Sequence, residues 1–134
     1  CTAKTNSLGC VPSIGATGSA SASGSPFTVT CVDELSHKLG LLFYGFAPRN
    51  AAYQGGYSCV QAPVRRTGLL DADGTIGVDD CSGVYSYDFD ALIQSGGDPA
   101  LIAGEVVYAQ FWSRDPAVSF TSIRSDGLRF GIAP

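Results

Sequence analysis

The chain alternates between short runs of β-branched and aromatic residues and clusters of turn residues, and this pattern limits the elements it can form. Turn signals about every 8–12 residues are typical of all-β sandwiches and barrels. The expected strands cover residues 26–33, 41–46, 57–61, 64–70, 83–89, 105–112, 119–124 and 127–132, with a weak edge strand at 17–23. The expected turns fall at 48–50, 55–56, 73–74, 96–97, 115–116 and 126–127, and a short helix is expected at 90–95 or 98–103. We predict an all-β fold: a single antiparallel β-sandwich, jelly-roll or Ig-like, with about seven to nine strands and disulfide staples.

Length and charge narrow the class further. A chain of 134 residues fits one domain, so residues 1–134 are expected to form a single β-sandwich. Charged residues make up only 15% of the chain, and the formal net charge is −4. Because an acidic chain does not neutralise phosphates, nucleic acid is excluded as a partner. The chain contains no apolar run of about 18 residues, so membrane insertion is not expected.

The N-terminal segment, residues 1–32, is unusual because residues 5–32 carry no charge and include ten Ser and Thr residues. Three interpretations fit such a segment: a flexible linker, a stretch that carries glycans, or strands covered by other protein surface, including a neighbouring subunit. Phe27, Val29 and Cys31 occupy alternate positions, which favours a strand at the end of this segment.

The five cysteines indicate a disulfide framework in an exported protein. Their spacing contains no CxxC motif, which argues against a zinc or haem site. Spacing alone does not give the connectivity, but we expect Cys1–Cys10 and Cys59–Cys81, because each pair closes a local loop. Cys31 is left over, either as a buried free thiol that behaves as a small hydrophobic residue or as one half of an intermolecular disulfide. The chain does not begin with Met, which indicates a processed mature form or a piece of a longer protein.

Six of the twelve acidic residues lie between residues 71 and 90. The sequence DADGTIGVDD, which starts at Asp71, partly resembles an EF-hand calcium loop. In that alignment Asp71, Asp73 and Thr75 are ligand candidates, and Asp80 is the closing acid. The match departs from the motif at two positions, because the first ligand position holds a leucine and the closing acid is not Glu. A polar hairpin loop with an Asp-Gly turn is the alternative interpretation.

The sequence predicts no enzyme and no cofactor other than calcium at this loop. It has one histidine, His37, in a polar segment between expected strands, and no GxSxG motif. Asp88 and Asp90 have the spacing of two carboxylates on one strand face, but solvated surface acids are the commoner case. In the pair Arg65-Arg66 the side chains alternate between faces, so at least one is expected to pair with a carboxylate.

Aromatic residues form a second candidate binding surface, because rings beside polar groups can stack on sugars. The alternative is that they fill the sandwich core with their polar tips at its edge. The candidates are Tyr44, Tyr53, Tyr57, Tyr85, Tyr87, Tyr108 and Trp112.

Several stretches together resemble an uncharacterised family of small exported, β-rich, disulfide-containing domains of planctomycete-like bacteria. They span nearly the whole chain and read CTAKTNSLGC, VPSIG, GLLFYG, CVQAPVRRT, DCSG, QFWSRDP and SDGLRF. The resemblance implies export and a β-rich module, either at the C-terminus of a longer surface protein or alone, and it carries over no catalytic residue. It also implies that Cys31 is not a usual cysteine position of the family.

These features lead to two functional hypotheses. The first is a non-enzymatic extracellular structural protein, a subunit or module of a cell-surface assembly. Residues 16–32 would then be buried against an identical subunit, with Thr17, Phe27, Val29 and Cys31 in the assembly segment, and head-to-tail strand addition would give a filament. The alternative is a carbohydrate-binding or adhesion module, with glycans as partners and calcium at residues 71–80.

Overall fold

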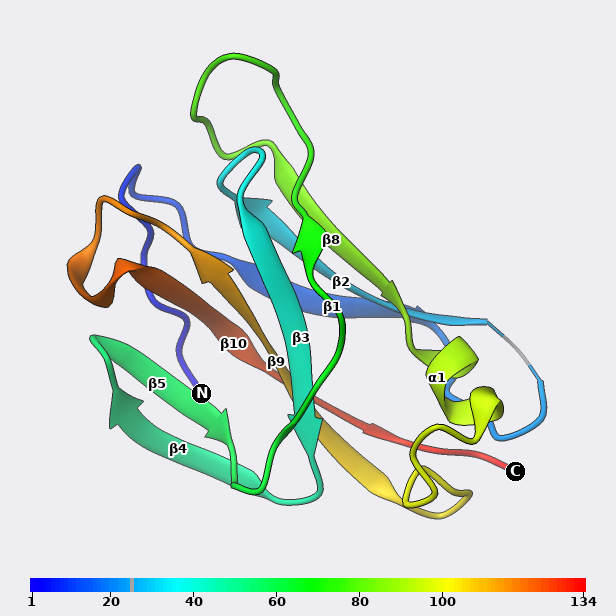
Figure 1. Cartoon of the computed structure of the whole chain (residues 1–134). Helices are drawn as coiled ribbons and strands as arrows, with labels where there is room; N and C mark the ends of the chain where they lie inside the picture. Colours follow the sequence, from blue (N-terminus) through cyan, green and yellow to red (C-terminus); the bar gives the residue numbers. More distant parts are fainter. Residues whose placement is uncertain (25) are drawn as a thin grey trace.

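A computed structural model describes residues 1–24 and 26–134 of the chain. Two antiparallel sheets face each other (Figure 1). The first sheet has the order β1-β2-β8, from β1 (Ser13–Gly18), β2 (Phe27–Glu34) and β8 (Gly83–Asp88). The second sheet has the order β10-β9-β3-β6, from β10 (Ser122–Gly131), β9 (Val106–Arg114), β3 (Leu39–Gly45) and β6 (Arg65–Arg66), and β7 (Leu70–Asp71) also pairs with β3. The predicted all-β sandwich with two disulfides is confirmed.

A separate two-stranded hairpin lies over the outer face of the second sheet, on the side away from the first sheet. It consists of β4 (Pro48–Tyr53) and β5 (Gly56–Val60), and it is the pair of strands at the lower left of Figure 1. The sequence predicted the second of these strands but placed a turn at 48–50, where β4 begins. Strand pairing has overridden the turn propensity of Pro48 here, because Pro48 is the first residue of its strand, where a missing N–H is tolerated.

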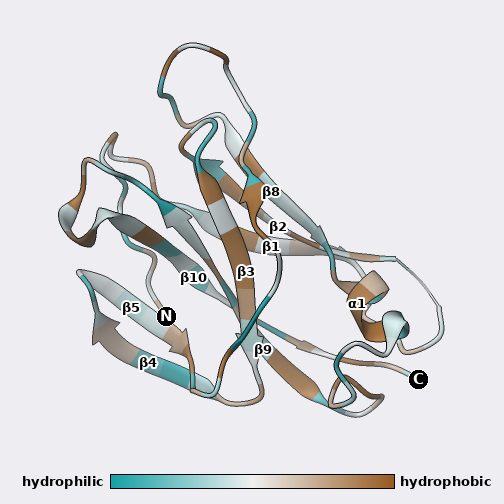
Figure 2. Ribbon diagram, viewed as in Figure 1, coloured by the Kyte–Doolittle hydropathy of each residue, from teal (hydrophilic) through white to brown (hydrophobic). Residues whose placement is uncertain are grey.

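The core forms between the facing sheets because alternate residues of each strand point inward. Val29 and Cys31 of β2 lie inside, as do Leu42 of β3 and Phe111 of β9, and all four side chains are fully buried. Figure 2 shows the hydrophobic colour along β3, which is apolar on both faces. That pattern follows from its position, since β3 has the core on one side and the hairpin region on the other.

One glycine in β3 is required by the packing of the core. The Tyr85 ring stacks on Phe111 with 5.7 Å between the ring centroids, and its hydroxyl donates to the backbone oxygen of Lys38 at 2.7 Å. A Cβ atom at Gly40 would lie 2.6 Å from Tyr85 Cζ and 2.6 Å from a backbone oxygen of Trp112. The ring of Tyr85 therefore passes over β3 only because residue 40 has no side chain.

The one α-helix of the described residues, α1 (Phe89–Ser95), follows β8 directly. Asp88 caps its start by accepting from the Ala91 amide, and Gly96 ends it in the left-handed conformation. The helix predicted at 90–95 is therefore present, whereas residues 98–103 form turns. Asp88 and Asp90 do not share a strand face, because Asp90 is buried in the helix. No helix in the described ranges is long and apolar enough to cross a membrane.

Three of the predicted strands differ from the observed ones. The expected edge strand at 17–23 is shifted, because β1 ends at Gly18. The expected strand at 64–70 is two strands of two residues each, which brings the number of strands among the described residues to ten. The expected strand at 119–124 begins as the 3-10 helix Ser119–Thr121, and β10 then runs on through a bulge between Arg124 and Gly127.

The disulfides join Cys1 to Cys59 and Cys10 to Cys81, so the predicted local pairing Cys1–Cys10 and Cys59–Cys81 is wrong. The prediction assumed that each bridge closes a short loop. Instead the first ten residues run along the sandwich, and the bridges tie this segment to the hairpin and to the long loop before β8, over 58 and 71 residues. Bridges of this kind are typical of proteins that fold in an oxidising compartment. Cys31 is a free thiol, fully buried in the core.

The uncharged N-terminal segment is covered by its own chain only in part. β2 is the central strand of the first sheet, and Phe27, Val29 and Cys31 belong to the core. β1 is an edge strand, and Thr17 on it is exposed. The segment contributes two strands to the sandwich, and burial accounts for the absence of charge at their inward-facing positions. More than half of the described residues from 5 to 32 are exposed, so burial does not account for the rest.

Candidate functional site

A pocket lies between the outer face of the second sheet and the β4–β5 hairpin. Its volume is about 580 Å³, within the range of roughly 300–1,000 Å³ that is usual for small-molecule sites. The sheet contributes Phe43, Arg66, Trp112 and Arg124, and the hairpin contributes Arg49 and Tyr53. We call the site formed by these six residues the Arg–aromatic pocket.

Strand register places the four sheet residues side by side. Phe43 of β3 lies directly opposite Arg66 of β6, and Trp112 of β9 lies directly opposite Arg124 of β10. Leu41 of β3 is the other neighbour of Trp112. Directly opposite residues of antiparallel strands project from the same face of a sheet. The floor of the pocket therefore combines two cations and two large rings.

Arg124 joins the floor to the hairpin. Its guanidinium carbon lies 5.0 Å from the ring centroid of Phe43 below and 4.5 Å from that of Tyr53 above. Rings attract a cation at such distances through their electron-rich faces. The Nε atom of Arg124 is buried without a hydrogen-bond partner. Burial lowers the pKa of Arg124 from its usual range, and nearby Arg66 lowers it further.

The pocket is positively charged although the chain as a whole is acidic. Three of the eight Lys and Arg residues line it, and no Asp or Glu residue does. Among the described residues, none of these arginines forms an ion pair. Arg65 provides the contrast, because its Nε lies 3.1 Å from Asp98 in a neighbouring pocket. One member of the pair Arg65-Arg66 thus has a carboxylate partner, as predicted, and the other faces the Arg–aromatic pocket.

Hydrogen bonds from a buried glutamine hold the hairpin over the sheet. Gln110 of β9 accepts from the Cys59 amide at 3.0 Å and donates to the backbone oxygen of Tyr57 at 2.9 Å. It also donates to the backbone oxygen of Ser125 on β10. A buried amide with both ends satisfied fixes the elements that it joins.

The N-terminal segment holds the other end of the hairpin. Lys4 Nζ donates to the backbone oxygens of Gln54 at the hairpin tip, Ser119 and Ser122. The disulfide between Cys1 and Cys59 adds a covalent tie. Since side chains, backbone and a disulfide all tie the hairpin down, the pocket is formed in the free protein.

No family model, curated protein or solved structure matches the chain. The function is therefore inferred from the chemistry of the pocket and from the other groups that the fold brings together.

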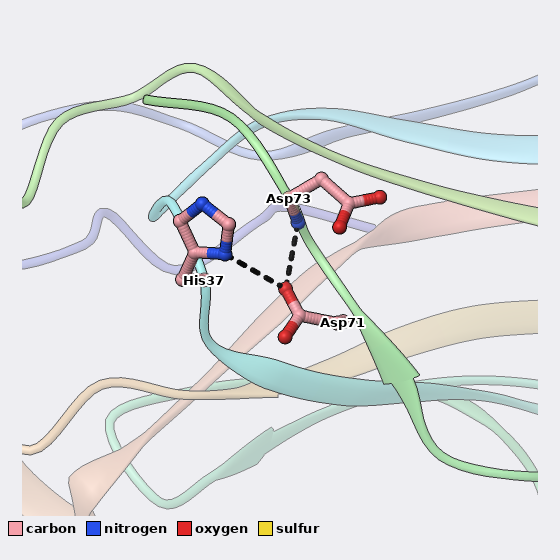
Figure 3. A group of neighbouring side chains, drawn as sticks. All are labelled: His37, Asp71 and Asp73. Atoms are coloured by element: carbon pink, nitrogen blue, oxygen red, sulfur yellow. Dashed lines mark hydrogen bonds and ion pairs between the residues drawn. The ribbon is translucent and has the colours of Figure 1, made fainter. Parts of the chain in front are cut away.

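The residues predicted to bind calcium fall into two clusters. In the first, His37 Nδ1 lies 3.4 Å from a carboxylate oxygen of Asp71, which also accepts from the Asp73 amide (Figure 3). Ligand atoms of His37, Asp71 and Asp73 lie within 4.8 Å of one another, and all three residues are exposed. His37 comes just before β3, which begins 32 residues before Asp71 in the chain. Only the pairing of β3 with β7 brings the two segments together, so the sequence analysis missed His37 as a member of this cluster.

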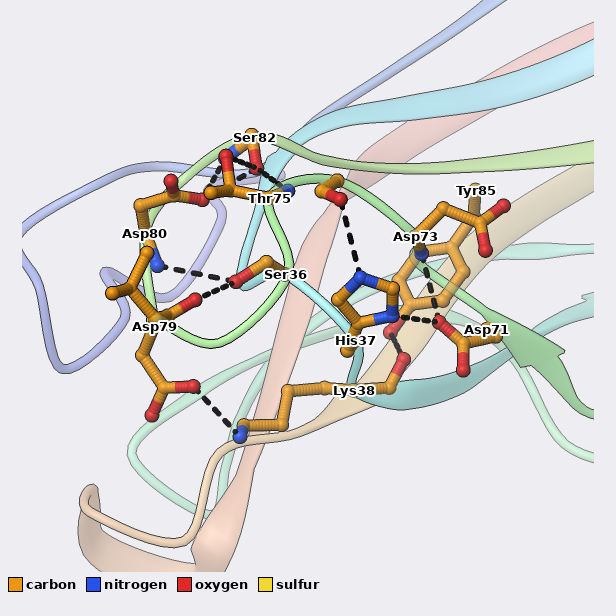
Figure 4. Close-up of polar contacts among 12 residues, drawn as sticks. Ser36, His37, Lys38, Asp71, Asp73, Thr75, Asp79, Asp80, Ser82 and Tyr85 are labelled. Carbon is orange, nitrogen blue, oxygen red and sulfur yellow. Dashed lines mark hydrogen bonds and ion pairs between the residues drawn. The ribbon is translucent and has the colours of Figure 1, made fainter.

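The second cluster contains the other two predicted ligands, Thr75 and Asp80. The Ser82 hydroxyl donates to a carboxylate oxygen of Asp80 and lies 3.3 Å from the hydroxyl of Thr75 (Figure 4). Ser36 accepts from the Asp80 amide at 3.2 Å. These hydrogen bonds hold the pKa of the Asp80 carboxyl below its usual range. The loop is thus organised by its own hydrogen bonds, and calcium at the four predicted residues, Asp71, Asp73, Thr75 and Asp80, stays a prediction.

The candidate aromatic residues divide between the core and the surface. Tyr44 and Tyr85 are buried between the sheets. Tyr53 and Trp112 line the Arg–aromatic pocket, whereas Tyr57 on the same hairpin is 41% exposed and does not line it. The sequence analysis missed Arg49, Arg124 and Phe43 as members of a site, because their proximity depends on strand register and on the position of the hairpin.

Beside Cys31 the core contains a buried carboxyl group. Glu34 is 2% exposed; it accepts from Ser113 Oγ at 2.9 Å and from Cys31 Sγ at 3.3 Å. Burial raises the pKa of Glu34 to about 7. The same burial, with the carboxyl of Glu34 nearby, raises the pKa of the Cys31 thiol far above its usual value. Cys31 is therefore a protonated, inert thiol at neutral pH.

Proposed function

We propose that the chain is a non-enzymatic extracellular module that binds carbohydrate in the Arg–aromatic pocket, in an adhesion role. The observation that carries the proposal is the position of Trp112 and Tyr53 at one pocket, beside arginine side chains that can donate hydrogen bonds. The apolar face of a sugar ring packs against an aromatic ring, and its hydroxyls need polar partners at the edge. The two disulfides support an extracellular location.

The accessible ring of Tyr53 and the preformed state of the pocket also support carbohydrate binding. Tyr53 is 44% exposed at the hairpin, so its ring is available to a ligand while its other side packs near Arg124. A preformed site avoids the entropy cost of ordering loops when the ligand binds.

A glycan array is the first test, with and without a chelator. We expect binding to a defined set of saccharides, and sensitivity to the chelator would assign calcium a part in it. Trp112 is the only tryptophan of the chain, so its fluorescence reports directly on the pocket when a positive saccharide is titrated.

The matched pair of variants is Tyr53→Ala and Tyr57→Ala. Both remove an exposed tyrosine ring from the same hairpin, but only Tyr53 lines the pocket. We expect the Tyr53 variant to lose about tenfold or more in affinity and the Tyr57 variant to bind normally. If no saccharide on the glycan array binds, either with or without the chelator, the proposal is overturned.

A second candidate function is self-assembly at the exposed end of the β1 edge, beyond Ile14, whose amide donates to Asp126. β1 is an edge strand, and Ala16, Thr17 and Gly18 on it are exposed, so an identical subunit could add a strand there. Deleting residues 16–32 is not a usable test, because it removes β2 from the core. Cys31 is fully buried, so an intermolecular disulfide at this position would require the core to open.

A charge on the edge is the sharper experiment. Lysine on an edge strand opposes strand addition, so Thr17→Lys should abolish filaments seen by negative-stain electron microscopy, while Cys31→Ser should leave them intact. Thr5→Lys, at an exposed position outside β1, is the control. A monodisperse monomer in the unmodified protein, with no ladder on non-reducing gels, would remove this candidate.

A further inference from the structure

We infer that the ligand of the Arg–aromatic pocket is an acidic saccharide, whose anionic group binds between Arg66 and Arg124 while its ring packs against Trp112. The inference rests on the proposed function and goes beyond it, because aromatic rings alone would serve a neutral sugar equally well. The carboxylate of a uronic acid and the sulfate of a sulfated sugar each offer two acceptor oxygens, which a guanidinium can bind through two parallel hydrogen bonds.

The lining of the pocket carries charge of one sign only, with cations and no anions. Arg49, Arg66 and Arg124 line one cavity that no carboxylate lines. Among the described residues outside the pocket, Lys38 pairs with Asp79 and Arg65 with Asp98, whereas the other three cations form no ion pair. A chain of net charge −4 has enough acids to neutralise every arginine. Three arginines that line one cavity without a carboxylate therefore favour a ligand that brings the counter-charge.

Two of these cations, Arg66 and Arg124, lie near each other. Strand register places Arg66 beside Phe43, and the guanidinium of Arg124 lies over the same Phe43 ring. Like charges brought to one ring repel each other, and the repulsion between Arg66 and Arg124 contributes to the lowered pKa of Arg124. An anion placed between them converts that repulsion into two attractions.

Arg124 is partly desolvated in the free protein. Its guanidinium lies between two rings, and its Nε atom is buried without an acceptor. The ring faces compensate only part of the lost hydration of a cation. The free protein already bears this desolvation cost. An anion that binds Arg124 therefore gains more binding free energy than one that binds an exposed arginine.

The arrangement of the pocket residues also sets the orientation of the saccharide. Trp112 lies directly opposite Arg124 on neighbouring strands, so a ring on Trp112 carries its substituents toward the two arginines. Arg49 is on the hairpin and reaches the pocket from the other side. A saccharide with one charge per ring can therefore place its first anionic group at Arg66 and Arg124 and the next near Arg49.

The test compares three probes of the same length on the intact protein: a galacturonic acid trimer, the matching neutral galactose trimer, and a sulfated galactose trimer. Binding is followed by Trp112 fluorescence and by calorimetry. We expect at least one acidic trimer to bind about tenfold or more tightly than the neutral one, and the preference between carboxylate and sulfate then assigns the anion. The affinity of the acidic trimer should fall as NaCl rises from about 50 to about 500 mM.

The variant Arg66→Gln removes one cation of the pair from an exposed position, so the fold is expected to tolerate it. It should lower the affinity for the acidic trimer about tenfold and leave the neutral trimer unchanged. Arg114→Gln is the control, since Arg114 is also exposed on the second sheet but does not line the pocket. Arg49→Gln gives an independent second removal of charge at the pocket.

The outcomes separate the two proposals. Equal binding of neutral and acidic trimers, with no effect of Arg66→Gln, would overturn the acidic ligand and leave carbohydrate binding in place. No binding of any of the three trimers, together with a negative glycan array, would overturn both proposals.

Discussion

The guanidinium carbon of Arg124 lies 4.5 Å from the ring centroid of Tyr53, which joins the edge strand of the second sheet to the hairpin that covers it. The two residues are 71 positions apart in the chain. Because Arg124 also packs on Phe43, the contact forms a stack of ring, cation and ring across the pocket. This stack positions the hairpin and exposes part of a cation to a ligand at the same time.

Replacement of Tyr53 by alanine tests the stack in the absence of a ligand. The variant loses one of the two ring faces on Arg124, so we expect unfolding to become easier by about 1 kcal/mol. Urea denaturation followed by the fluorescence of Trp112 measures the change. Tyr57→Ala is the control, since its ring is exposed on the same hairpin. Equal effects of the two variants would contradict a role for the stack.

Gln110 should be the most sensitive polar residue near the pocket. It is fully buried, and Gln110→Ala leaves the Cys59 amide and the backbone oxygens of Tyr57 and Ser125 without their partner. A loss of about 2–4 kcal/mol in unfolding free energy is expected. Hydrogen exchange at the Cys59 amide should also quicken more than exchange within β2. The exposed Gln61→Ala should change neither quantity.

The disulfide pairing can be checked by mass spectrometry of peptides from non-reduced protein. We expect cross-linked peptides that contain Cys1 with Cys59 and Cys10 with Cys81. Removal of the first bridge by the double change Cys1→Ser and Cys59→Ser should cost about 4 kcal/mol, because the bridge closes a long loop in the unfolded chain. Recovery of a Cys1–Cys10 peptide would contradict the structure at this point.

The fold class followed from the local sequence pattern, whereas the pairing of β4 with β5 and the pairing of the cysteines did not. Alternation along β2 and the β-branched, aromatic content of β9 are properties of neighbouring residues, and both strands were predicted nearly at their observed bounds. The local signals at Pro48 favoured a turn, and only pairing with β5 extends the chain there. The disulfides likewise depend on the path of the N-terminal segment, which its composition does not determine.

The candidate site shows the same division. Tyr53 and Trp112 were candidates as aromatic residues of a binding surface, because residue type alone suggests stacking. That Trp112 lies opposite Arg124 depends on the register between β9 and β10 before the bulge that separates Arg124 from Gly127. Whether the pocket arginines have ion-pair partners depends on the positions of all carboxylates in the folded chain. A local stretch of sequence does not give those positions.

Glu34 should make the stability of the fold depend on pH. The groups around its buried carboxyl come from three strands and the turn after β9: Cys31, Ser113 and Tyr85 contact or face it, and Asp115 adds a like charge. Burial raises the pKa from 4.5 to about 7. Below about pH 4.5 the carboxyl is protonated in both the folded and the unfolded chain, so it carries no penalty.

Between these two values the folded chain binds more protons at Glu34 than the unfolded chain does, so this group makes stability fall as pH rises. The loss should reach about 3 kcal/mol above the folded pKa. Urea unfolding at a series of pH values measures it in the wild type and in Glu34→Gln, which keeps the shape of the side chain without the titration. The wild type should lose stability relative to this variant as pH rises from 4.5 toward 8, and parallel curves would contradict the prediction. Glu105→Gln, at the only other glutamate of the chain, controls for the change in net charge.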